Sequence, residues 1–504
     1  MTSPTRAFQG ADTGRLDLGA VAGALSERYL IVRAPARSVR CRRLDTADRR
    51  VRAAGLVLEH QTAPRSRRLV LRRADGSHAA SMVDDLRWPA LAEMLPAGPV
   101  GDEVAAAVGI RALTVVADER RSWQRWDLHD AEGKTVARIA VDEPGADDGA
   151  PAELAILGLR GYEDDARRVA RLLLGLGLRA VERVAPGPAA VVTSGRMDPD
   201  VPAVGLVLRA LVEFQGAMRS NLPGLLDDVD TEFLHEFRVA LRRTRTTLRL
   251  GRPILPELLR REWEPAFAWV GALTTPVRDL DVYVLGLPTM AGWLVAADAS
   301  DLEPFARHLA VRRSAARATM LRGLRSARYR ALMTTWEQRL AALAATSVDD
   351  PPEPLSAGEL AGRHLDRMHR KVVREGAAIS GESPADDLHR LRGRCKELRY
   401  ALEVFAPVAD PRIGKRAITD LKGLQDVLGR FQDAEVQRRA LREFADEMML
   451  EGVPAAALLA LGELIAHLDA EQVRARDEFD RAFAAFVRTS GTTAVRPHRL
   501  GGGT

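Results

Sequence analysis

The spacing of apolar residues changes along the chain and predicts two kinds of structure. Up to residue 184, short apolar runs and two-residue alternation predominate, which is typical of β-strands. From residue 204 onward, apolar residues recur every three or four positions, which is typical of amphipathic helices. Residues 185–203 are rich in proline, glycine and alanine and are predicted to be a linker. We therefore expect a multidomain protein, with an antiparallel, strand-rich α+β domain over residues 15–184 and an all-α domain over residues 204–488.

Two hairpins, one further strand and one helix are predicted in the N-terminal domain. Each hairpin joins two alternating segments across a turn that contains glycine. The hairpin strands are Leu69–Leu71 with His78–Met82, and Trp123–His129 with Thr135–Val141. Glu153–Leu159 is predicted to be a strand, and Tyr162–Leu178 a helix whose first turn carries three acidic residues, where the helix dipole favours them.

Prolines mark the predicted ends of helices in the C-terminal half, because proline removes a backbone donor and clashes with the preceding turn. The predicted breaks are residues 251–256, Pro276, Pro288, Pro384 and residues 407–411. A longer proline-rich break at residues 347–357 divides this half into a first repeat, residues 204–346, and a second repeat, residues 358–488. The glycine-rich tail, residues 489–504, is predicted to be disordered.

An internal repeat is the strongest signal in the sequence. Residues 234–250 and 388–404 match at a constant offset of 154 residues. In each copy a histidine and three cations are spaced i, i+3, i+7 and i+10, which places them on one face of a helix. The first row is His235, Arg238, Arg242 and Arg245, and the second row is His389, Arg392, Lys396 and Arg399. One residue ahead of each row runs an apolar stripe, so each helix should bury the stripe and present the row at its edge.

The offset of 154 residues also relates residues 278–282 to residues 432–436. A unit of several helices is therefore duplicated, and two such units are expected to pack with pseudo-two-fold symmetry. Positions beside the rows have diverged between the copies, for example Thr246 and Tyr400, whereas the rows have persisted. This difference favours a functional role for the rows over a merely solvated surface.

The chemistry of the rows suits a phosphate polyanion. Arginine offers a planar fork of donors that binds phosphate oxygens bidentately. Several such side chains on rigid helices produce a positive field that attracts a flexible polyanion. Histidine adds a donor whose protonation a neighbouring anion favours.

These motifs resemble the CHAD domain, the conserved histidine α-helical domain. The resemblance rests on the doubled L-H-x-x-R-x-x-x-[RK] helix, on R-D-x-D-V at residues 278–282 and on LQDVLGRFQDAEV at residues 424–436, and it covers about residues 204–488. It implies two similar helical bundles that bind inorganic polyphosphate in a central basic cleft, with polyphosphate granules as a cellular partner. The implied contacts are the eight residues of the two rows. Further candidates are Arg312, Arg313, Arg363, Arg370 and Lys371.

Residues 15–184 resemble a divergent CYTH domain, a β-rich tunnel that hydrolyses triphosphate substrates with a divalent metal. Residues 42–60, the hairpin that ends at Glu143, and residues 152–178 carry this resemblance. The family's E-x-E-x-K motif is missing, because Glu27 and Glu59 are the only glutamates before residue 60 and no lysine occurs there. We therefore expect a decayed enzyme with no catalytic residue, metal or cofactor. The alternative is a metal-dependent inorganic triphosphatase joined to a polyphosphate-binding domain.

Composition leaves a second alternative open, because arginine rows bind any phosphate backbone. The net charge is +5, from 74 basic and 69 acidic residues, so charge alone does not identify a polyanion-binding protein. A nucleic-acid-binding protein is disfavoured by the low aromatic content of 5%, since stacking on bases needs exposed aromatic rings. The two cysteines, Cys41 and Cys395, fall in different predicted domains, which excludes a disulfide framework and favours the cytoplasm.

Overall fold

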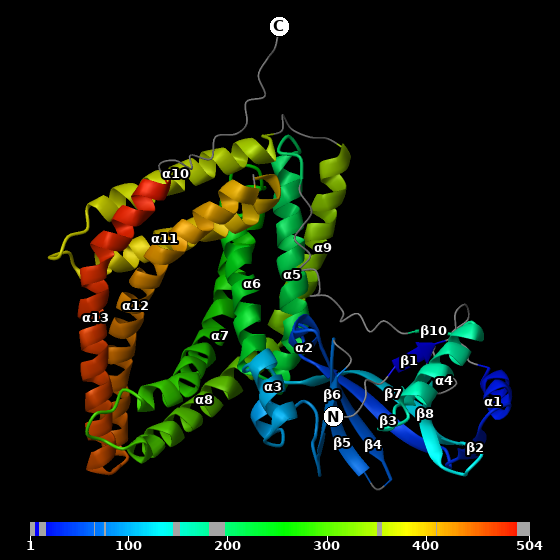
Figure 1. Ribbon diagram of the computed structural model, residues 1–504. Coiled ribbons are helices and arrows are strands. Elements are labelled where there is room, and N and C mark those ends of the chain that lie inside the picture. Colours follow the sequence, from blue (N-terminus) through cyan, green and yellow to red (C-terminus); the bar gives the residue numbers. More distant parts are fainter. Residues whose placement is uncertain are drawn as a thin grey trace. The chain divides into compact units, whose positions relative to one another are not determined.

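The computed structural model describes residues 6–9, 17–64, 66–74, 77–144, 152–180, 197–349, 355–409 and 411–490 (Figure 1). The chain divides into two units, residues 1–193 and 194–504. Most of the predicted linker (residues 185–196), the turn residues 75–76 and the tail from residue 491 lie outside the described residues. Within them, no helix is long and apolar enough to cross a membrane.

The N-terminal unit is built on one antiparallel sheet, whose strand order in the described residues is β10-β1-β9-β8-β7-β3-β4-β5-β6, with β2 paired to β7. Both predicted hairpins are confirmed, as β5 with β6 and β7 with β8. The strands are β1 Arg6–Gln9, β2 Leu30–Arg33, β3 Arg37–Asp45, β4 Leu56–Ala63, β5 Ser66–Arg73, β6 His78–Met82, β7 Thr114–His129, β8 Thr135–Pro144, β9 Glu153–Leu157 and β10 Arg179–Ala180. The long strand β7 joins the two ends of the sheet, because its first part pairs with β3 and its second part with β8 and β2.

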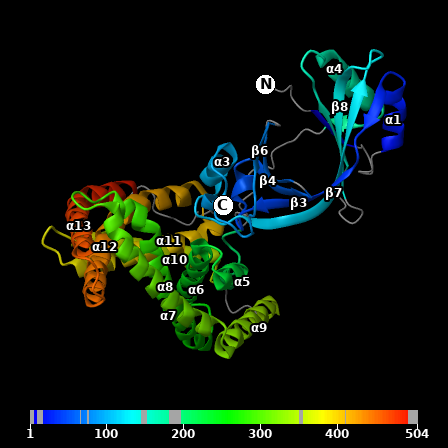
Figure 2. The same ribbon diagram turned by 90° about the horizontal axis from the view of Figure 1, so that it is seen from below.

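Helices cover the sheet of this unit over two separate cores. Helices α1 (Leu18–Ser26) and α4 (Glu163–Gly175) pack on β7, β8 and β9, and Figure 2 shows them beside β7 and β8. Helices α2 (Arg50–Ala53) and α3 (Pro99–Val108) pack on β3, β4 and β5. The helix predicted at Tyr162–Leu178 is thereby confirmed with slightly shorter bounds.

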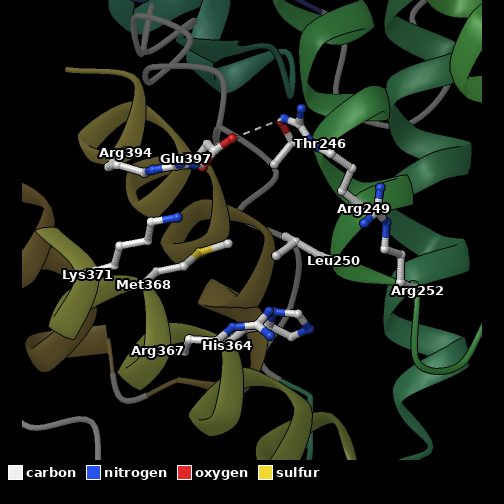
Figure 3. A pocket seen from close by; sticks show the side chains of 10 residues that line it. All are labelled: Thr246, Arg249, Leu250, Arg252, His364, Arg367, Met368, Lys371, Arg394 and Glu397. Atoms are coloured by element: carbon white, nitrogen blue, oxygen red, sulfur yellow. Dashed lines mark hydrogen bonds and ion pairs between the residues drawn. The ribbon is translucent and has the colours of Figure 1, made fainter. Parts of the chain in front are cut away.

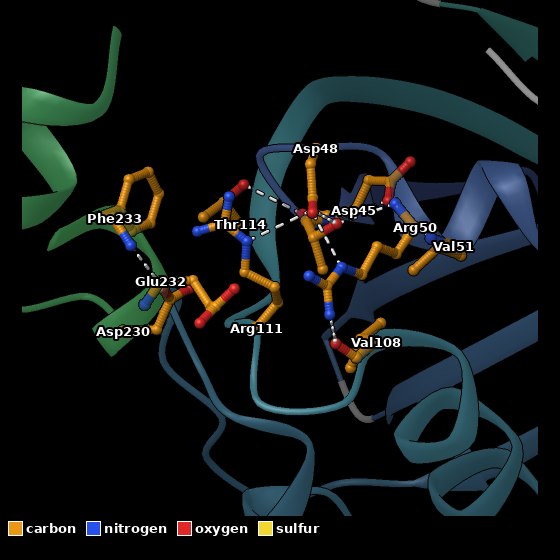
Figure 4. A network of polar contacts seen from close by, with 11 residues as sticks. Asp45, Asp48, Arg50, Val51, Val108, Arg111, Thr114, Asp230, Glu232 and Phe233 are labelled. Atoms are coloured by element: carbon orange, nitrogen blue, oxygen red, sulfur yellow. Dashed lines mark hydrogen bonds and ion pairs between the residues drawn. The ribbon is translucent and has the colours of Figure 1, made fainter. Parts of the chain in front are cut away.

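A polar network fixes the turn between β3 and α2 (Figure 4). The buried carboxylate of Asp45 accepts backbone N–H donors from Thr46 and Val51, at 2.8 and 2.9 Å. Arg50 donates to Asp48 at 2.8 Å and to the carbonyl of Val108 at 3.0 Å, which ties α2 to the end of α3. Because the buried carboxylate of Asp45 is paired with backbone donors of the turn, Asp45 and Thr46 have a structural role here.

The C-terminal unit is a duplicated set of helices. Helices α5, α6 and α7 begin 154 residues before α10, α11 and α12, so the repeat predicted from the sequence is confirmed at each of these three helix starts. The bounds are α5 Ala203–Asp227, α6 Thr231–Leu250, α7 Glu257–Ala291, α8 Glu303–Leu324, α9 Ala327–Asp349, α10 Ala357–Ala377, α11 Ala385–Phe405, α12 Pro411–Leu450 and α13 Ala455–Ser490.

Reciprocal contacts between α6 and α11 establish the pseudo-two-fold axis. Arg243 of α6 pairs with Glu403 of α11 at 2.7 Å, and Arg249 of α6 pairs with Glu397 of α11 at 3.8 Å. At the offset of 154 residues, Arg243 is equivalent to Glu397 and Arg249 to Glu403. Each ion pair is therefore the symmetry partner of the other, which is the signature of a two-fold contact. Thr246 lies midway between the two ion-paired residues of α6, and Tyr400 lies midway between those of α11. The axis therefore passes between Thr246 and Tyr400.

Two apolar cores hold the duplicated unit together. The larger core contains both predicted stripes, every member of which is at most 6% exposed. The stripe residues are Leu234, Phe237, Leu241 and Leu248, and Leu388, Leu391, Cys395, Leu398 and Leu402. The smaller core joins the far ends of the hairpins α7–α8 and α12–α13, through residues such as Phe305 and Phe444. The basic rows thus border a rigid core, as the sequence predicted.

The helix breaks predicted at Pro276 and Pro288 are wrong, because both prolines lie inside α7. Near Pro276 the carbonyl oxygen of Gly271 accepts hydrogen bonds from Thr275 Oγ1 at 2.9 Å and from Arg238 Nη1 at 3.3 Å. Pro276 lacks the N–H that would bond the carbonyl of Ala272, but burial of Phe267, Val270 and Val277 in the larger core holds α7 on both sides of the proline, and the helix continues. Pro288 lies in the last turn of α7, which is held by the burial of Met290 in the smaller core.

Candidate anion-binding site

Both basic rows begin near the start of their helices and lie at the edge of a buried stripe. Asp230 caps α6 by accepting the backbone N–H groups of Glu232 and Phe233, at 2.9 and 3.2 Å. In α11, Asp386 and Asp387 occupy the first turn. Most of the row side chains are half-buried, because the residue before each of them is buried in the core.

The second member of each row is fixed to the next helix of its own repeat. Arg238 donates from Nη1 to the hydroxyls of Thr274 and Thr275 of α7, both at 2.9 Å. Arg392 donates to Gln432 Oε1 at 2.9 Å and pairs with Asp433 at 3.0 Å, both on α12. Asp433 therefore serves as a partner of an arginine of the second row.

The fourth member of each row also points toward the following helix. Arg399 Nη1 donates to Gln425 Oε1 of α12 at 3.4 Å. Arg245 lies against Gly271 of α7, where an added Cβ would come within 3.8 Å of its Nη1. Gly271 and Gln425 are equivalent positions in the two repeats, so this arrangement is shared as well.

Arg242 and Lys396 are equivalent positions that meet near the axis. Burial lowers the pKa of Lys396 to about 8, helped by the positive charges of Arg392, Arg242 and Arg399. The guanidinium of Arg242 lies 5.0 Å from the ring centre of Tyr400. The guanidinium of Arg399 lies 5.3 Å from the same ring centre. Among the described residues, neither Arg242 nor Lys396 has a hydrogen bond or an ion pair. The two rows therefore meet at two cations that lack an ion-paired carboxylate among the described residues, although the charge of Asp433 acts on Lys396 from a distance.

The two row histidines lie in different electrostatic environments. Burial lowers the pKa of His235, and the positive charges of Arg278 and Arg242 lower it further. His389, in contrast, has its Nε2 2.8 Å from a carboxylate oxygen of Glu435. His235 is therefore neutral at neutral pH until an anion offsets the nearby arginines.

Arg278 of α7 is a candidate site residue that sequence reasoning missed. Its Nη1 is buried and has no hydrogen-bond partner among the described residues. Its charge lowers the pKa values of both His235 and Arg238, so it belongs to the same cluster. Arg278 lies in the repeated segment 278–282, but its equivalent in the second repeat is Gln432, so it is not among the cations that the two copies share.

The five additional candidates do not join the rows as a group. Arg312 pairs with Glu447, and Arg313 binds Asp228 at 2.7 Å and Asp281 at 2.6 Å. Arg363 and Arg370 are exposed on α10. Lys371 lines a separate pocket.

The N-terminal unit contains a cavity of about 470 Å³ on its sheet, lined by arginines and by two carboxylates, Asp142 and Glu153. Asp142 pairs with Arg121 at 2.9 Å, and Glu153 accepts a hydrogen bond from Gln9 at 2.8 Å. The nearby Glu59 pairs with Arg72 at 3.2 Å. Among the described residues, no cluster of three or more His, Cys, Asp or Glu side chains is arranged to hold a metal ion.

Comparison with known proteins identifies the helical region. The family model described as "CHAD domain" matches residues 209–442. Residues 209–442 are a CHAD domain. The resemblance inferred from the doubled row is thus confirmed. No match was found among curated proteins.

Solved structures that resemble the chain fall into two groups. The CHAD domain of the plant Ricinus communis is 24% identical, with 58% of this chain and 96% of that chain covered and a TM-score of 0.49. PptA from Streptomyces chartreusis is 22% identical, with 56% and 99% covered and a TM-score of 0.43. A putative adenylate cyclase from Vibrio parahaemolyticus is 10% identical, with 34% and 84% covered and a TM-score of 0.21.

Proposed function

We propose that the CHAD domain binds inorganic polyphosphate between its two basic rows. The observation that carries this proposal is the convergence of Arg242 and Lys396, two cations without acidic partners, beside further arginines. Burying a charge without a partner is unfavourable, and the lowered pKa of Lys396 reflects that cost. A polyanion would relieve it by supplying negative charge along the whole cluster.

Polyphosphate fits this cluster better than a single-stranded nucleic acid does. The aromatic residue that contacts Arg242 and Arg399 is Tyr400, which is only 4% exposed. A buried ring offers no face on which a base can stack, whereas phosphate oxygens need only the arginine and lysine donors. The proposed setting is the cytoplasm, with polyphosphate granules as the place of binding.

The first test is the salt dependence of binding by the full chain. Long-chain polyphosphate is expected to bind, and its affinity is expected to fall about 100-fold between 50 and 200 mM salt if about five phosphates are neutralised. Fluorescence anisotropy with end-labelled polyphosphate measures this slope. Absence of binding at low salt, or equal affinity for a single-stranded nucleic acid of matched charge, would contradict the proposal.

A second test uses the pH dependence that Lys396 imposes. Its pKa is about 8 in the free protein, and a bound polyanion raises it, so binding takes up protons above about pH 8. Each unit by which the bound polyanion raises this pKa is worth a factor of ten in affinity. A rise of about one unit therefore predicts about a tenfold loss of affinity between pH 7 and pH 10. Calorimetry in two buffers of different ionisation enthalpy measures the proton uptake. In Lys396→Arg the side chain stays charged, so the uptake above pH 8 should disappear, and its persistence there would assign it to another group.

A further inference from the structure

A second basic pocket lies between the end of α6 and helices α10 and α11 (Figure 3). It has a volume of about 440 Å³, within the range of small-molecule sites. Five cationic side chains line it, and none of them belongs to either basic row. They are Arg249, Arg252, Arg367, Lys371 and Arg394.

Acidic residues compensate these cations only in part. Glu397 is the single carboxylate in the lining, and it pairs with Arg394 at 3.1 Å and with Arg249 at 3.8 Å. Just outside the lining, Glu375 lies 3.6 to 3.8 Å from Arg394 and Lys371, and Glu264 lies 3.8 Å from Arg252. Separations of this size in partly exposed pairs give weak attraction. Arg394 alone therefore has a carboxylate within hydrogen-bond distance among the described residues.

His364 adds no charge to the pocket in the free protein. Burial lowers its pKa, and the charge of Arg367 lowers it further. Arg367 Nη2 lies 3.1 Å from His364 Nδ1, so the neutral ring accepts its hydrogen bond and positions the guanidinium. Arg367 itself is exposed and has no carboxylate partner among the described residues.

The pocket is not a by-product of the duplication, because its symmetry-equivalent lacks the cations. At the offset of 154 residues, Lys371 and Arg394 correspond to Ala217 and Ala240. Arg367 and Arg249 correspond to acidic residues, Glu213 and Glu403. Positive charge has therefore gathered on one side of the pseudo-two-fold axis only, unlike the two rows, which match each other.

We propose that this pocket binds a short oligophosphate group. Arginine forks and a lysine around a concave surface suit several phosphate groups held close together, each with oxygens for bidentate contact. Leu250 and Met368 form an apolar floor that leaves these cations as the polar contacts at the rim. The bound phosphates could belong either to a free short oligophosphate or to one end of a long polyphosphate chain, and the experiment below distinguishes the two. The proposal does not require the rows to bind polyphosphate.

Tripolyphosphate is the probe, measured by calorimetry with the full chain at about 150 mM salt. The variant Arg252→Glu with Lys371→Glu is expected to lose at least tenfold in affinity, because two donors become repulsive. The matched control is Arg325→Glu with Arg330→Glu, which makes the same charge change on exposed positions, one after α8 and one on α9, outside the pocket. We expect this control to change affinity less than threefold. If the charge-reversed variant has a lower melting temperature, Arg252→Gln with Lys371→Gln replaces it, because it removes the same two positive charges without adding negative ones.

The outcomes separate the proposal from its rivals and from the proposed function of the rows. Absence of tripolyphosphate binding, or an equal loss in the pocket variant and its control, overturns the proposal. If the pocket variant also weakens long-chain polyphosphate, the pocket holds a chain end. If long-chain binding is unchanged, the ligand is a free oligophosphate. Failure of the rows appears instead as long-chain binding that is insensitive to Arg242 and Lys396.

Discussion

Reversing the charges of Arg242 and Lys396 together should lower the affinity of the full chain for long-chain polyphosphate by about 100-fold or more. Each lost charge-assisted contact is worth about 1.5–3 kcal/mol, and every 1.4 kcal/mol is a factor of ten. The fold should persist, because neither side chain has a hydrogen bond or ion pair to lose among the described residues. Anisotropy at about 150 mM salt measures the affinity, and thermal melting checks the fold.

The single variants test whether both rows take part. Arg242 and Lys396 are equivalent in the two repeats and lie near the axis, so Arg242→Glu and Lys396→Glu should weaken binding to a similar extent. A tenfold difference between two folded variants would show that one row binds and the other does not. Arg325→Glu with Arg330→Glu is the matched control, since both residues are exposed and the pair makes the same charge change as Arg242→Glu with Lys396→Glu. An equal loss there would mean that binding is diffuse.

The fold of the helical half could be predicted because its apolar residues recur at helical spacing and the whole pattern repeats along the chain. The stripes at Leu234–Leu248 and Leu388–Leu402 specify which face of α6 and α11 is buried, and the constant offset specifies the duplication. Helix continuity through Pro276 could not be predicted. It depends on the burial of Phe267, Val270 and Val277 in the larger core, and these contacts exist only after the helices have packed.

The site was predicted in part for the same reason. Spacing placed the four cations of each row on one face, but it could not tell which of them would stay free. Arg238 and Arg392 turn onto α7 and α12, whereas Arg242 and Lys396 remain without acidic partners. Residues brought together from different helices carry no periodic signal at all. Arg278 and the cations of the second pocket are of this kind.

The first part of β7 was missed because its charged residues stand at consecutive positions, so it shows no apolar alternation. Residues 118–121 read Asp-Glu-Arg-Arg. Their pairing with β3 is stabilised by cross-strand ion pairs such as Asp118 with Arg40. A strand of this kind becomes recognisable only when its partner strand is known.

Arg313 was a candidate phosphate contact, and the structure gives it a different role. Its guanidinium binds Asp281, which is 0% exposed, and also Asp228, at 2.6 and 2.7 Å. Burial raises the pKa of Asp281 even though Arg313 opposes this. Removing the arginine would leave a buried carboxylate without its ion pair. We therefore expect Arg313→Ala to lower the free energy of unfolding by about 3–5 kcal/mol.

Its neighbour Arg312 is the matched control for that substitution. Arg312 pairs with Glu447 at the surface, where the two side chains are 46% and 41% exposed, so Arg312→Ala should cost less than about 1 kcal/mol. Urea denaturation of the full chain measures both variants. The double variant Arg313→Met with Asp281→Leu should recover part of the loss, because it removes both buried charges. Polyphosphate affinity of the folded Arg313→Ala protein should stay within threefold of the original. A large loss of affinity with unchanged stability would instead make Arg313 a ligand-binding residue.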